Sequence, residues 1–276
     1  MRLLKKLFKM CAAVLLVALI CCIPVYIIVF KVLPDKDPDN QFNRDTILQA
    51  LSGETRVYFN DSTELLGAFF DANHRIYVPY GDIPINIVNA LIAAEDAGYW
   101  QHNGFSFHGF FRAMASNLKS GSMRQGGSTL TQQTVKNIFG REERSIKEKG
   151  KELLNALRME RHFSKEDILE FYLNQFHVSG SGKGVAIAAQ YFFNKDLKDL
   201  TLAECAFIAG SVKGPSNYDP FIQRTVERRE KAIARGAERL KYVLGRMVEE
   251  GYIEQKDMDR RSKNLSPSTT ATSASP

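Results

Sequence analysis

The stretch GGSTLTQQTVKN, residues 126–137, has the features of a helix with an unusual polar face. Two glycines precede Ser128, whose hydroxyl is a good N-cap. On a 3.6-residue wheel the apolar side chains gather on one side. The other side carries hydroxyls, amides and the single ammonium group of Lys136, whereas a solvated helix face is usually rich in Glu and Lys. We therefore expect this face to contact either another polar protein surface or a sugar or phosphate ligand.

Composition and charge narrow the possible functions. The chain has 276 residues, of which 44% are hydrophobic and 25% are charged. This is enough for one well-packed core. The formal net charge of +6 suits nucleic acid, anionic lipid or a phosphorylated substrate about equally.

The N-terminus favours a membrane protein. Residues 10–30 carry no charge and match the ~20 residues needed to cross a bilayer, which predicts one retained transmembrane anchor. Basic residues precede this segment, so residues 1–9 are expected in the cytoplasm. The rest of the chain would then lie on the outer, periplasmic side of the inner (cytoplasmic) membrane. Such a protein is not expected to bind nucleic acid.

The remaining sequence predicts one mainly α-helical domain. Residues 31–54 indicate a juxtamembrane linker, residues 55–255 the domain, and residues 256–276 a Ser/Thr-rich tail or a linker to a further domain. Short extended segments are expected within residues 56–80. Helices are expected near residues 110–119, 128–139, 145–160, 165–176, 184–193, 201–212 and 221–250.

Taken singly, the residues that could carry chemistry give weak signals. Glu95 and Asp96 end an apolar helix, which is typical of a solvated helix end. Alternatively, one of them is a general base in a cleft, where partial desolvation would raise its pKa. The charged run of residues 141–161 resembles an ordinary solvated helix face.

Four segments in order resemble the family 51 glycosyltransferases, the peptidoglycan polymerases. These enzymes occur alone as monofunctional transglycosylases or as the N-terminal domain of class A penicillin-binding proteins. The segments are EDAGYWQHNG (residues 95–104), GGSTLTQQ (126–133), RSIKEKGKE (144–152) and KEDILEFYLN (165–174). A later segment, DLTLAECAFIAGSVKGPSNYDP, is also similar to the family.

The resemblance implies a lysozyme-like helical domain with a small membrane-proximal jaw subdomain. It implies inverting transfer of a growing, lipid-diphosphate-linked glycan onto the 4-hydroxyl of lipid II, which forms β-1,4 links in cell wall synthesis. The implied partners are lipid II, the nascent glycan strand and the membrane. Cell wall synthesis or division proteins are further candidate partners. No cofactor is required, and a divalent cation is an optional aid.

Site residues follow from the same resemblance, position by position. Glu95 matches the general base, and Glu152 matches a second catalytic glutamate near the diphosphate. No metal ligands are implied. The substrate-binding positions of the family fall on Ser128, Gln132, Gln133, Lys136, Asn137 and Arg144.

The sequence also departs from the family pattern. Glu148 stands where the family usually has arginine, and Ala186, Tyr191 and Asn194 replace its glutamate, arginine and glycine. These changes bear on donor affinity, while Glu95 and Glu152 are kept. Three other functions are weighed against the polymerase: a lysozyme-like hydrolase, an inactive scaffold and a basic nucleic-acid binder.

Overall fold

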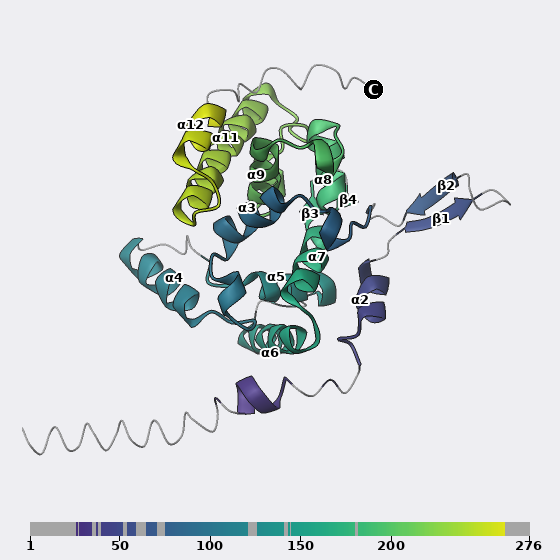
Figure 1. The fold of residues 1–276 in the computed structure, drawn as a ribbon, viewed down its shortest axis with the longest axis vertical. Helices are drawn as coiled ribbons and strands as arrows, with labels where there is room; N and C mark the ends of the chain where they lie inside the picture. Colours follow the sequence, from purple (N-terminus) through teal and green to yellow (C-terminus); the bar gives the residue numbers. More distant parts are fainter. Residues whose placement is uncertain are drawn as a thin grey trace, which may run out of the picture.

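The computed structural model confirms a mainly helical chain (Figure 1). It describes residues 26, 28–34, 37, 40–51, 54–58, 65–70, 75–120, 126–140, 143, 145–179 and 182–262. The predicted cytoplasmic segment, most of the predicted anchor and most of the predicted tail lie outside these residues. Within the described ranges, no helix is long and apolar enough to span a bilayer.

One group of helices surrounds the first motif. Helix α3 (Ile85–Glu95) packs against α9 (Leu202–Ser211) and α11 (Val226–Glu249), which also pack against each other (Figure 1). The apolar face of α3 is fully buried between them. Glu95, the last residue of α3, is therefore held at the end of a rigid element.

A second group carries the other motifs. Helix α5 (Leu130–Phe139) packs against α6 (Ile146–His162) and α7 (Lys165–Gln175). Helix α8 (Val185–Phe193) contacts both α7 and α9, and so joins the two groups (Figure 1).

The remaining elements are short or peripheral. Strands β1 (Glu54–Tyr58) and β2 (Leu65–Phe70) pair antiparallel and project from the helices, as the extended segments predicted (Figure 1). Strands β3 and β4 form a second small antiparallel pair. The other elements are η1 (Ile28–Val32), α2 (Arg44–Leu51), η2 (Tyr80–Asp82), η3 (Tyr99–Gln101), α4 (Phe107–Ser120), β3 (His177–Val178), β4 (Gly182–Lys183), η4 (Leu197–Asp199), α10 (Pro215–Tyr218) and α12 (Gln255–Ser262).

Helix α4 exposes apolar side chains. Phe107, Phe111, Met114 and Leu118 are all exposed, although the helix follows directly on the first motif. Exposed apolar side chains gathered on one helix are typical of a surface that contacts a partner or a membrane.

The fourth motif binds the segment before α3. The Asn174 side chain accepts from Val78 N at 2.8 Å and donates to Val78 O at 2.8 Å. Glu170 accepts a hydrogen bond from Tyr80 N at 2.6 Å and forms an ion pair with Arg44. These contacts satisfy backbone groups that no sheet or helix pairs, so this motif has a structural role.

Two departures from the family pattern have local structural explanations. Asn194 ends α8 in the left-handed region, with φ 51° and ψ 45°. Asparagine tolerates this conformation better than other residues with a side chain, so it replaces the family's glycine at little cost. The hydroxyl of Tyr191 donates to buried Asp219 at 2.9 Å.

Candidate active site

Glu95 is held by an arginine that lies 144 residues further along the sequence. Its carboxylate, 14% exposed, pairs with the guanidinium group of Arg239 on α11. Arg239 Nε also donates to the carbonyl oxygen of Gly210 at 3.0 Å. Sequence reasoning missed Arg239, because a charged residue on a long amphipathic helix carries no signal of a distant partner.

The surroundings of Glu95 make it a stronger base than an ordinary glutamate. Burial raises the pKa of its carboxyl group, while the positive charges of Arg239 and Lys213 lower it, and the net pKa is raised. A raised pKa strengthens the carboxylate as a proton acceptor. This fits the second of the two sequence interpretations, a carboxylate in a partly desolvated site.

Tyr172 of α7 connects Glu95 to the polar stretch. Its hydroxyl donates to Gln133 Oε1 at 3.2 Å. Burial and the nearby charge of Glu95 both raise the pKa of Tyr172. The first, second and fourth motifs therefore meet around one buried phenol.

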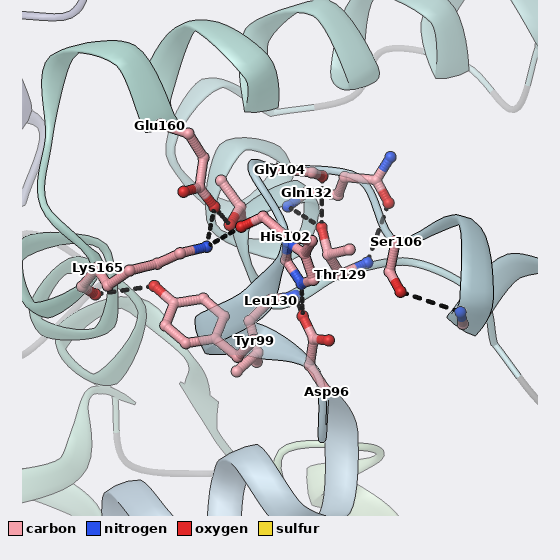
Figure 2. Close-up of polar contacts among 12 residues, drawn as sticks. Asp96, Tyr99, His102, Gly104, Ser106, Thr129, Leu130, Gln132, Glu160 and Lys165 are labelled. Carbon is pink, nitrogen blue, oxygen red and sulfur yellow. Dashed lines mark hydrogen bonds and ion pairs between the residues drawn. The ribbon is translucent and has the colours of Figure 1, made fainter.

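Asp96 joins the first motif to the start of α5 (Figure 2). Its Oδ2 accepts from Leu130 N at 2.9 Å and lies 2.9 Å from His102 Nε2. A carboxylate at a helix N-terminus is stabilised by the free N–H groups there. Asp96, 7% exposed, thus orients α5 relative to α3.

The expected N-cap of this helix was wrong by one residue. Thr129, not Ser128, caps α5, and its hydroxyl donates to Gly104 O at 2.8 Å while accepting from Gln132 N (Figure 2). The Gln132 side chain returns to accept from Thr129 N at 3.0 Å and completes a capping box. Gln132 is therefore only 2% exposed, rather than lying on an open polar face. Ser128, Gln133 and Asn137 are half-buried and Lys136 is exposed.

Lys149 connects the second motif to the third. Its ammonium group donates to Ser128 Oγ at 2.8 Å and pairs with Glu152, which is 8% exposed. The structure thus brings together Ser128 and Glu152, two site residues that the resemblance implied. The residue that joins them, Lys149, was not among the predicted site residues. Its position one helical turn before Glu152 in RSIKEKGKE was the available signal.

The other site positions are less closely connected. Asn137 contributes its backbone carbonyl, which accepts from Gln175 at 2.9 Å. Arg144 lies outside the described residues. Glu148 pairs with Lys151 at 2.7 Å, and its backbone N–H donates to the N-cap Ser145 at 3.1 Å, so this departure has a local role at the start of α6.

Metal-ligating side chains do not cluster among the described residues. In the part of the chain that the structure describes, no three His, Cys, Asp or Glu side chains lie close enough to hold an ion. Glu95 and Glu152 each face a cation instead.

A cavity lies beside Arg239, the ion-pair partner of Glu95. Its volume is about 490 Å³, and Arg239 forms part of its wall. The remaining lining residues are Lys213, Asn217, Tyr218, Arg235 and Glu238. The lining carries three cationic side chains and one carboxylate, that of Glu238. This excess of positive charge favours an anionic or strongly polar ligand.

The family model for transglycosylases matches residues 62–248, which include all four motifs. The chain belongs to this family. It is 36% identical over 255 residues to penicillin-binding protein 1A of Pseudomonas aeruginosa, which covers 92% of this chain and 29% of that protein. Penicillin-binding protein 1A of Aquifex aeolicus is 41% identical over 181 residues, 65% of this chain and 23% of that protein.

A solved structure adds a further similarity. The crystal structure of penicillin-binding protein 1A from Haemophilus influenzae matches with 25% identity and a TM-score of 0.41, over 77% of this chain and 20% of that one. The chain spans less than a third of the length of these curated relatives.

Proposed function

We propose that the chain is a peptidoglycan glycosyltransferase that polymerises lipid II. One observation carries the proposal: inside the family-matched region, two carboxylates with little solvent exposure each face a cation, Glu95 with Arg239 and Glu152 with Lys149. Inverting transfer from a diphosphate needs a carboxylate that accepts a proton and fixed cations that stabilise the leaving group.

In the proposed reaction, Glu95 acts as the general base. The 4-hydroxyl oxygen of lipid II attacks the anomeric carbon of the growing strand, and Glu95 accepts the hydroxyl proton. The bond to the diphosphate breaks, and its electron pair leaves with the diphosphate. The strand is then β-1,4-linked to the new lipid II. A well-placed base accelerates such a step by ~100- to 10,000-fold.

The cations of the second and third motifs would receive the diphosphate. Lys149 already donates to Ser128 and Glu152, so its ammonium group is held in place before substrate arrives. Lys136 extends from the same helix as the capping box and is exposed. We include Arg144, Gln132, Gln133 and Asn137 in the substrate site on the strength of the family motif.

We further propose that the protein is a single-pass inner-membrane protein with its catalytic domain on the periplasmic side. The uncharged residues 10–30 support an anchor. The exposed apolar side chains of α4 support a membrane-proximal jaw beside the site. A lipid-linked substrate would reach Glu95 from this side.

The test is polymerisation of labelled lipid II by detergent-solubilised protein, with gel analysis of the products. Glu95→Gln should lower turnover by at least ~100-fold, because an amide cannot accept the proton. The matched control is Glu166→Gln, an exposed glutamate on α7, which should retain wild-type activity. A folded Glu95→Gln protein that still forms long strands contradicts the proposal. Disaccharide release from pre-formed glycan without strand growth would instead indicate a hydrolase.

A further inference from the structure

Arg239 is fixed more firmly than a simple ion pair requires. Its Nε donates to Gly210 O at 3.0 Å, and its guanidinium carbon lies 4.8 Å from the centre of the Tyr242 ring. A Cβ atom added at Gly210 would lie 3.1 Å from Arg239 Cγ, so glycine allows the close approach of α9 and α11. The side chain is only 9% exposed.

The charged groups around Glu95 come from several elements. Arg239 on α11 and Lys213, which follows α9, are positive. Asp96, the next residue, is negative, and Tyr172 on α7 is a neutral phenol whose pKa is raised. Among the described residues, Arg239 is the cation that pairs directly with the Glu95 carboxylate, so its removal changes the charge balance most.

We propose that Arg239 is a positioning residue that holds the Glu95 carboxylate in one orientation and keeps it ionised, so that the base is ready at neutral pH. This inference rests on the proposed function of Glu95. Without Arg239, desolvation would raise the pKa of the Glu95 carboxyl group further, and a protonated Glu95 cannot accept the hydroxyl proton. Arg239 thus offsets the desolvation that makes Glu95 a strong base.

Arg246 provides a matched control. It lies two turns further along α11. Like Arg239, it donates its Nε hydrogen to a backbone carbonyl, but the acceptor is Ala93 O of α3, at 3.1 Å. Its carboxylate partners are Glu249 and Glu250 on its own helix, not Glu95. Arg239→Met and Arg246→Met therefore both remove a contact between α11 and α3, but only the first leaves Glu95 without its cation.

The experiment measures kcat/KM for lipid II from pH 5 to 9 in wild type, Arg239→Met, Arg239→Lys and Arg246→Met. An opposite charge lowers a carboxyl pKa by about 1–3 units, so Arg239→Met should move the acidic limb to higher pH by this amount. Its deficit should be large at pH 6 and shrink as the pH rises. Arg239→Lys keeps the charge but not the forked geometry, so its limb should lie between the two. Arg246→Met should keep the wild-type limb.

A second measurement separates this inference from the proposed function. The difference in melting temperature between each protein and its Glu95→Gln derivative, followed across the same pH range, reports the titration of Glu95 without any substrate. Arg239→Met should shift this titration to higher pH. An unshifted titration, or a loss of activity equal at every pH, overturns the role of Arg239. A shifted titration in a protein that does not polymerise lipid II supports that role and overturns the proposed function alone.

Discussion

Asp96→Asn tests whether the second carboxylate of the first motif aligns the site or takes part in the chemistry. Both contacts of Asp96 use the same oxygen, Oδ2, which faces Leu130 N and His102 Nε2 (Figure 2). An asparagine oxygen in that place keeps both hydrogen bonds but loses the charge. Hydrogen bonds to charged groups contribute about 1.5–3 kcal/mol each, against about 0.5–1.5 kcal/mol for neutral ones.

The expected loss is therefore about 2 kcal/mol in the free energy of unfolding, from about 1 kcal/mol per bond. For a domain of this size, that corresponds to a fall of about 4–8 °C in melting temperature. Turnover measured well below the melting temperature should stay within about tenfold of wild type, because loss of a general base costs ~100-fold or more.

The assays are a thermal melt and lipid II polymerisation on the same detergent-solubilised preparations. Asp82→Asn, at an exposed aspartate of η2, is the control and should change the free energy of unfolding by no more than about 0.5 kcal/mol. An Asp96→Asn protein that melts like wild type but turns over ~100-fold more slowly would refute the reasoning and place Asp96 in the chemistry.

Two further predictions concern the diphosphate and the membrane. Lys149→Met should lower turnover by ~100-fold or more, because it removes a fixed cation from the leaving-group site, whereas Lys151→Met on the exposed side of α6 should not. An equal loss of turnover in both variants would contradict a specific role of Lys149 at the leaving-group site. Deletion of residues 1–31 should lower polymerisation in bilayers more than in micelles, since the anchor keeps the domain near a lipid substrate. A deficit of the same size in both media would count against that reason.

Much of the helical fold could be predicted, because it depends on local patterns. The segments expected near residues 145–160, 165–176 and 184–193 match α6, α7 and α8 to within about two residues, the usual uncertainty of helix ends. Apolar periodicity and capping residues such as Ser164 act within one or two turns, so the sequence displays them directly.

The site was harder to predict from the sequence, because its contacts join segments that are distant along the chain. Glu95 and Glu152 were named through the family motifs, but the cation facing Glu95 is 144 residues away. The capping error had a different cause. Ser128 and Thr129 are both good N-caps, and the choice between them depends on Gly104, whose carbonyl oxygen accepts a hydrogen bond from the Thr129 hydroxyl in the folded domain.

The burial of α3 between α9 and α11 has a consequence for the synthesis of the protein. At about 5–20 residues per second, the ribosome needs roughly 7–30 s to progress from Glu95 to Arg239. During that interval the apolar face of α3 lacks the cover that α11 supplies, and the carboxylate at its end has no arginine. Transiently exposed apolar surface of this kind makes a nascent chain prone to aggregation until α11 emerges. Helix α11 is therefore needed to complete the cover of α3, and we expect a chain interrupted before Val226 to be prone to aggregation.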